Sequence, residues 1–163
     1  MNENIDLNKL PSDVKKEFMK YALKLKEKKT KSKVHDDFLT FAKHVWPEFI
    51  EGKHHKIIAE KFNRLAKGEI KRLIINMPPR HTKSEFASNL LPAWMIGRKP
   101  NLKIIQTTHT TELAVRFGRK AKTLIDSPEY QQVFQTRLRE DSQAAGKWET
   151  EQGGEYYAAG VGS

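Results

Sequence analysis

The sequence predicts an α/β fold in which strands and helices alternate through the second half of the chain. Two short apolar runs, Leu73–Ile75 and Leu102–Ile105, have the length of buried strands. Each run is followed by apolar residues at helical spacing, which gives the order strand, helix, strand, helix. Because such units place their strands side by side and their helices over the faces, we expect a parallel sheet with flanking helices.

The N-terminal region, residues 1–34, is predicted to be a basic helix and a linker. The helix is expected from Ser12 to about Lys29, with Ser12 as its cap. Its apolar stripe consists of Val14, Phe18, Tyr21, Ala22 and Leu25. The lysine-rich stretch Lys24–Lys33 is expected to fray into the linker. Its charges fit either DNA contact or a solvated helix end, and solvation is the commoner reason for such runs.

Two further helices are predicted between Asp36 and Lys67, divided by Pro47 and Gly52. Their apolar residues recur at helical spacing, which is typical of helices that face a core. These residues are Phe38, Phe41, Ala42, Val45 and Trp46 in the first helix, and Ile57, Ile58, Phe62 and Leu65 in the second. We expect residues 35–163 to form one domain that opens with this helix pair.

The predicted sheet begins with a strand at residues 72–76, buried on both faces. Pro78 and Pro79 end this strand because proline cannot continue a strand inside a sheet. A helix is expected over residues 84–97, bent or interrupted at Pro92.

A second strand is predicted at residues 102–107, followed by a helix at 110–126 that Thr110 caps. The end of that strand, Thr107–Thr110, would also face a ligand crevice if the sheet is parallel. The last stretch, residues 147–163, alternates aromatic and small residues and predicts a hairpin at a sheet edge.

The joint between the first strand and its helix has the layout of a P-loop. The pattern G-x-x-x-x-G-K-[ST] places Met77 and Thr82 where the two glycines stand, whereas Lys83 and Ser84 match it. A loop between strand and helix directs backbone N–H groups and the helix dipole at one point, which suits a phosphate. The motif alone leaves two alternatives, nucleotide binding and an ordinary joint with a solvated Lys-Ser tip.

Under the first alternative, Lys83 faces the β- and γ-phosphates of ATP, and the Ser84 hydroxyl binds Mg²⁺. Arg80 supplies a second cation that stabilises phosphate charge, so Arg80 and Lys83 are the predicted catalytic residues. Thr82 would need φ > 0, which is costly for a β-branched side chain. The predicted nucleotide-binding segment consists of Met77, Pro78, Pro79, Arg80, His81, Thr82, Lys83 and Ser84.

From Phe38 to its end, the chain resembles the ATPase domain of tailed-phage terminase large subunits, the motors that pump DNA into empty capsids. The resemblance lies in residues 73–85, 91–94, 97–100, 104–109, 112–114, 117–119, 125–130, 148–150 and 153–162, in one consistent order. An arginine in the loop is usual in that family, and Arg80 supplies it. Glycine is commoner in the family where Thr82 stands, and this departure bears more on turnover than on binding.

The resemblance implies a P-loop NTPase of the ASCE-like type that couples ATP hydrolysis to translocation of phage DNA into the procapsid. The implied cofactors are ATP and Mg²⁺. The implied partners are double-stranded DNA, the portal protein, the small terminase subunit and further copies of the chain in a ring, without a membrane. The place of action would be the host cytoplasm, at the procapsid. The residue that seats adenine in the family corresponds to His55 or to Lys56.

One part of the family pattern is missing from this sequence. The family has a hydrophobic strand that ends in paired acids, whereas the run Leu102–Ile105 ends in Gln106 and Thr107. Without such acids, Mg²⁺ lacks its second protein ligand and nothing orients the attacking water. The nuclease domain is also missing. We therefore expect the front portion of a packaging ATPase, with Mg·ATP binding but negligible hydrolysis alone. The alternative is a non-enzymatic basic protein that binds DNA or capsid and retains a vestigial loop.

The composition is consistent with a polyanionic partner. The 163 residues carry a formal net charge of +10, with a pI near 9.7. The lack of cysteine excludes disulfides and cysteine-ligated zinc. The sequence has neither an apolar run of membrane-spanning length nor a signal-peptide pattern. The six histidines are not spaced as metal ligands.

Overall fold

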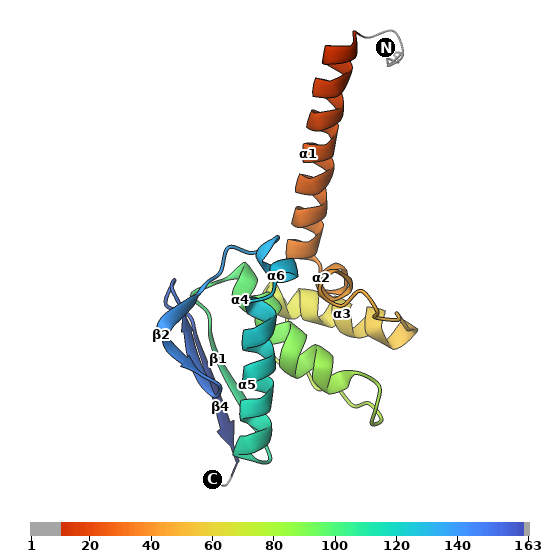
Figure 1. Ribbon diagram of the computed structural model, residues 1–163. Helices are drawn as coiled ribbons and strands as arrows, with labels where there is room; N and C mark the ends of the chain where they lie inside the picture. Colours follow the sequence, from red (N-terminus) through yellow and green to blue (C-terminus); the bar gives the residue numbers. More distant parts are fainter. Residues whose placement is uncertain (1–10, 162–163) are drawn as a thin grey trace.

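A four-stranded mixed sheet with helices beside it forms the body of the protein, and one long helix projects from that body (Figure 1). The computed structural model describes residues 11–161. The fold is therefore of the mixed α/β kind that the sequence predicts. Its sheet, however, is not the parallel sheet that we expected, because two of its three strand pairs are antiparallel.

The helices are α1 (Ser12–Asp36), α2 (Phe38–Val45), α3 (Lys53–Ala66), the π-helix η2 (Glu85–Leu90), α4 (Leu91–Arg98), α5 (Thr111–Ile125) and α6 (Pro128–Gln131). The strands are β1 (Lys103–Thr108), β2 (Leu138–Ala144), β3 (Lys147–Thr150) and β4 (Glu155–Gly160). The predicted helix pair before residue 67, the predicted strand at 102–107 and the predicted helix at 110–126 are confirmed to within a few residues. Thr110 caps α5 as expected, since its hydroxyl accepts from the Leu113 N–H at 3.3 Å.

The strand order in the sheet is β1-β4-β3-β2. Strand β4 pairs parallel with β1, where Ile104 lies opposite Tyr156, and antiparallel with β3, where Trp148 lies opposite Tyr156. The hairpin predicted within residues 147–163 is thus confirmed, but its expected position at a sheet edge is wrong. Both of its strands have a second neighbour, because β1 and β2 cover its two outer edges.

The strand predicted at residues 72–76 is wrong. The segment Arg72–Met77 has no regular secondary structure, and it forms no backbone–backbone hydrogen bond with the part of the chain that the structure describes. Leu73 and Ile75 are partly buried against the core, whereas Ile74 is 86% exposed. An open hollow lies between this segment and α3, lined by Leu73–Met77 from one side and by His54, Ile57, Ile58 and Lys61 from the other. The apolar run therefore contacts the core without joining a strand ladder.

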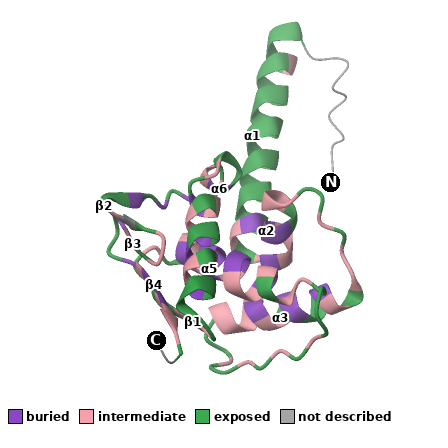
Figure 2. Cartoon of the chain, turned by 60° about the horizontal axis from the view of Figure 1, so that its bottom comes forward, coloured by how far each residue is buried: buried purple, intermediate pink, exposed green. Residues whose placement is uncertain are grey.

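Helix α1 is longer than predicted. The stretch Lys24–Lys33 is helical throughout, so the expected linker is wrong, and Ser12 is the first helical residue rather than a cap. Lysine has good helix propensity, which explains why the charged run does not end the helix. The helix ends where Asp37 turns extended and caps α2, its carboxylate accepting from the Thr40 N–H at 2.8 Å. Most of α1 is exposed (Figure 2).

The predicted interruption at Pro92 takes the form of a change in helix type. Proline has no N–H with which to continue an α-helical ladder. Just before it, the Leu91 N–H donates to the Phe86 carbonyl five residues back, which is the π-helical pattern. The predicted helix at 84–97 is therefore two helices in sequence, η2 and α4.

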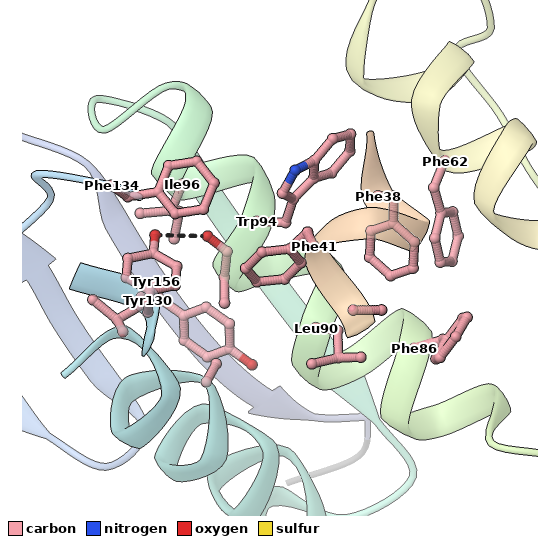
Figure 3. Packing of buried hydrophobic residues seen from close by; sticks show 14 of the residues in the cluster. Phe38, Phe41, Phe62, Phe86, Leu90, Trp94, Ile96, Tyr130, Phe134 and Tyr156 are labelled. Carbon is pink, nitrogen blue, oxygen red and sulfur yellow. Dashed lines mark hydrogen bonds between the residues drawn. The ribbon is translucent and has the colours of Figure 1, made fainter. Parts of the chain in front are cut away.

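Aromatic side chains from α2, α3, η2 and α4 form the centre of the core (Figure 3). The ring of Phe38 lies edge-on to Phe62, Phe86 and Trp94, with centroid distances of 4.8, 5.3 and 5.5 Å. Such contacts add to the free energy of burying each ring. Of the apolar residues predicted in α3, Ile57 departs from the expectation, since it is 60% exposed. Because Phe86 is the second residue of η2, this cluster anchors the helix that follows the loop at residues 77–84.

Candidate functional site

The loop Met77–Ser84 leads from the unpaired segment Arg72–Met77 into η2 and lies against the N-terminal end of α3. The closest contact joins the His55 Nε2 and Thr82 Oγ1 atoms at 2.6 Å. A second contact brings the rings of His54 and His81 to 5.9 Å between centroids. The starts of two helices, α3 and η2, are therefore close to the same loop.

Two residues of this loop have left-handed backbone angles. Arg80 has φ of 64° and Thr82 has φ of 60°, and they are the only non-glycine residues with positive φ among residues 11–161. For an L-residue this conformation costs roughly 1–2 kcal/mol. The expectation that Thr82 takes φ > 0 is confirmed. Strain of this kind collects at functional sites and persists only where neighbouring groups enforce it.

A chain of hydrogen bonds, which we call the His55 relay, holds Thr82 in this conformation. It consists of Gly52, His55, Thr82 and His81. The Gly52 N–H donates to His55 Nδ1 at 2.8 Å, so this nitrogen is unprotonated and the ring proton is on Nε2. The Nε2–H donates to Thr82 Oγ1 at 2.6 Å, and the Thr82 hydroxyl donates to the His81 carbonyl at 2.6 Å. Every donor in the relay has an acceptor.

The surroundings of His55 favour the neutral ring that the relay requires. Its side chain is buried, with Phe49 and Phe86 at ring distances of 4.7 and 5.0 Å. Burial lowers the pKa of His55 below its ordinary value, and the neighbouring His54 lowers it further, against an opposing effect of Glu51. The ring is therefore neutral at pH 7, with one nitrogen free to accept from Gly52.

Several backbone donors of the loop have no backbone acceptor. The amide N–H groups of Thr82, Lys83 and Ser84 form no backbone–backbone hydrogen bond within the described part of the chain, whereas Pro79 and Arg80 lie in a hydrogen-bonded turn. The first helical bond joins the Phe86 N–H to the Thr82 carbonyl at 2.9 Å. Unpaired N–H groups at a helix start, together with the helix dipole, form a binding site for an anion.

Three cationic or hydroxyl side chains predicted for the site lie on this loop. The Lys83 Nζ is 3.4 Å from the Met77 carbonyl, so the ammonium is folded back over the loop. The side chains of Arg80 and Ser84 are exposed. The loop thus presents Arg80, Lys83 and the Ser84 hydroxyl together with the unpaired amides.

The remaining loop residues shape the turn. Pro78 and Pro79 are exposed and lack N–H groups, and the Pro79 carbonyl accepts from His81 Nδ1 at 2.9 Å. Met77 is partly buried against the core. A role for Met77, Pro78, Pro79 and His81 in binding nucleotide stays a prediction.

The carboxylates near the loop are engaged elsewhere. Glu85 lies in the first turn of η2, where it complements the helix dipole, and it accepts from Lys120 at 2.8 Å and from Asn89 at 2.6 Å rather than from Arg80. It therefore joins η2 to α5. Glu112 lies in the first turn of α5, where it complements the dipole of that helix. Within residues 11–161, no group of three or more histidine, aspartate or glutamate side chains could hold a metal ion.

The two adenine candidates have other partners in this structure. Both ring nitrogens of His55 are engaged in the relay. The Lys56 ammonium pairs with Glu51 at 2.9 Å. Contact of either residue with adenine stays a prediction.

The His55 relay was not predicted from the sequence, although half of it is local. His55 is the third residue of a helix that Gly52 caps, and a side chain at this position can reach back to the cap N–H. The other half, the contact with Thr82, joins residues that are 27 positions apart. Spacing along the chain carries no information on such a contact.

Comparison with known proteins yields no match for this chain, whether to a protein-family model, a curated protein or a solved structure. In the described residues, none of the helices has the combination of length and apolar character that a membrane crossing needs. The chemistry of the loop is thus the main guide to function. It provides N–H donors without backbone acceptors and the cations Arg80 and Lys83, groups whose chemistry suits a multiply charged anion.

Proposed function

We propose that the loop Met77–Ser84 binds the phosphates of ATP, with Mg²⁺, in a P-loop NTPase fold. One observation carries this proposal: the unpaired amides of Thr82–Ser84 and the Lys83 side chain lie together at the start of η2, in a loop with positive φ at Arg80 and Thr82. Donors that already point at one place lose little entropy when they bind an anion. A solvated turn would gain nothing from this strain, since a relaxed conformation would serve it equally well.

Each residue has a specific role in this proposal. Lys83 leaves the Met77 carbonyl, a contact of 3.4 Å, and pairs with the β- and γ-phosphates. Arg80 turns its exposed guanidinium to the γ-phosphate and stabilises its charge. The Ser84 hydroxyl becomes one ligand of Mg²⁺. The His55 relay keeps Thr82 out of the path of the phosphates.

We further propose that this site belongs to the ATPase part of a DNA-packaging motor like the terminase large subunits. The motif order supports this assignment, and the net charge of +10 supports a polyanionic partner. The partners would be double-stranded DNA, the portal protein, the small subunit and other copies in a ring. The motor would act in the host cytoplasm, at the procapsid, where ATP hydrolysis drives DNA translocation.

A titration of the whole chain with a fluorescent, non-hydrolysable ATP analogue and Mg²⁺ tests the nucleotide site. We expect saturable binding that Lys83→Ala weakens by about tenfold or more, because a charge-assisted phosphate contact is lost. The matched control is Lys67→Ala, which removes an equal charge from the exposed end of α3. Equal affinities for Lys83→Ala and Lys67→Ala would refute the proposal.

Two further titrations identify which groups of the nucleotide and metal the loop contacts. AMP should bind far more weakly than ATP, since the loop contacts are to the outer phosphates. Ser84→Ala should reduce the difference in affinity with and without Mg²⁺ and leave metal-free binding unchanged. If AMP and ATP bind alike, the loop is not a phosphate site.

A further inference from the structure

The projecting helix α1 carries an apolar stripe that stays exposed to solvent in the described part of the chain. We call Val14, Phe18, Tyr21 and Leu25 the α1 seam. These four side chains are between 41% and 62% exposed. They are separated by four, three and four positions, which is the repeat of apolar residues along a coiled-coil interface. An exposed stripe of this kind usually marks a binding surface.

The α1 seam points away from the body of the protein. Val34 is the buried residue of α1, and Trp94 Nε1 donates to its carbonyl at 3.3 Å. Leu25 precedes Val34 by nine positions, which is about two and a half turns, so the two side chains lie on opposite sides of the helix. Met19 and Leu23 lie near the Val34 side by the same arithmetic. The helix is therefore anchored by one side near its C-terminal end and presents the seam on the other side. Figure 1 shows that most of its length projects from the body of the protein.

The charges beside the α1 seam indicate what can cover it. Helix α1 has nine lysines and four acidic residues, a formal charge of +5. If Phe18 and Leu25 take the a positions of the heptad, the flanking e and g positions hold Lys15, Glu17, Ala22, Lys24, Lys29 and Lys31. A second parallel copy would place Lys24 opposite Lys29, and like charges at these positions oppose pairing.

We propose that α1 is a docking helix for an amphipathic helix of another protein, one with acidic residues at its e and g positions. Its apolar residues would interlock with the α1 seam, and its carboxylates would pair with the flanking lysines. Duplex DNA would use the lysines but would leave Phe18, Tyr21 and Leu25 without a function. This proposal is independent of the nucleotide site.

The test uses the whole chain and two labelled synthetic peptides of about four heptads each. Both peptides have leucine at a and d; one has glutamate at e and g, and the other has lysine. By fluorescence anisotropy, we expect the acidic peptide to bind at least about tenfold more tightly than the basic one, with affinity falling as salt rises.

Two double variants locate the binding face. Phe18→Ser with Leu25→Ser should weaken the acidic peptide by about tenfold or more, since both anchors are lost. Met19→Ser with Leu23→Ser changes two residues on the other side of α1 and should leave the affinity within about twofold. These side chains are exposed, so both variants should keep the thermal unfolding midpoint of the wild-type chain.

Three results would overturn the proposal. The first is equal or absent binding of the two peptides. The second is self-association of the chain that Phe18→Ser with Leu25→Ser abolishes, since the occupant would then be a second copy. The third is binding of duplex DNA that depends on Phe18 and Leu25 while the acidic peptide does not bind.

Discussion

Left-handed backbone occurs in two kinds of place in this protein, and the two are supported differently. At Gly68, after α3, and Gly153, between β3 and β4, φ is 78° and 82°, with no neighbouring atom within 4 Å of an added Cβ. At Arg80 and Thr82 the same conformation is imposed on side chains that disfavour it. The glycine turns need no support, whereas Thr82 is held by the His55 relay. The difference indicates that the loop conformation is retained for what the loop does rather than for chain reversal.

Of the substitutions that test this comparison, His55→Ala should reduce the free energy of unfolding most. The variant leaves Thr82 without its clamp and the Gly52 N–H without its acceptor. We expect the free energy of unfolding to fall by about 2–3 kcal/mol, the loss from a buried hydrogen-bonded group. Urea unfolding measures it. The control is His109→Ala, an exposed histidine whose loss should stay within about 0.5 kcal/mol. Similar losses in both variants would mean that the relay contributes nothing.

Thr82→Gly tests whether strain and relay are coupled. In the wild-type chain it relieves strain but removes the partner of His55, so we expect a net change within about 1 kcal/mol. In the His55→Ala chain only the relief remains, and stability should rise by about 1–2 kcal/mol. A double-mutant cycle from four unfolding curves gives the coupling. If the changes in unfolding free energy for Thr82→Gly and His55→Ala are additive, the strain at Thr82 is independent of the relay. Nucleotide affinity shows whether Thr82 also contacts the ligand, since Thr82→Gly would then weaken binding.

The glycine turns should respond differently. Gly68→Ala places a Cβ on left-handed backbone with no clash, so strain alone is added. We expect a loss of about 1 kcal/mol in stability and no change in affinity for the ATP analogue. Calorimetry and the titration described above measure both. A change in affinity would show that the turn after α3 also shapes the loop.

The smallest expected effect is a change with pH in the stability that His55 contributes. The pKa of His55 is lowered by burial, so the unfolded chain binds this proton more readily than the folded chain. Its contribution is therefore fully present above the ordinary histidine pKa of about 6.5 and is lost as pH falls through the lowered value. The stability advantage of wild type over His55→Ala should shrink over this range. An advantage that stays constant from neutral to acidic pH would show that protonation leaves the relay intact.

Local features of the site were predictable from sequence. Lys83, Ser84 and the positive φ of Thr82 follow from the spacing of one motif, because that motif is built within a few residues. The relay was not predictable, since it depends on how α3 packs against the loop. The sheet shows the same limit. Leu73–Ile75 and Leu102–Ile105 have similar composition, yet only the second lies in a strand, because β4 pairs with it.

Helix α1 was predicted in part, because some of its features depend on local sequence and its C-terminal end depends on packing. Its start and its apolar stripe are local, and both are close to the prediction. Its end is not local, since Val34 is buried against the body and the Trp94 indole binds the backbone of Val34 and His35. Packing therefore carries the helix through a lysine-rich stretch that composition alone assigns to a linker.

The His55 relay also constrains how this loop can change over generations. With glycine at position 82 the backbone is relaxed, and many residues are acceptable at position 55. With Thr82 in place, replacing His55 exposes the full strain of the loop together with an unpaired donor. The two positions are thus epistatic, and the order of substitution matters: the histidine must be present before the threonine and cannot be lost until glycine returns. Once both residues are present, neither His55 nor its hydrogen bonds to Thr82 at 2.6 Å and to Gly52 at 2.8 Å can be lost without a cost in stability.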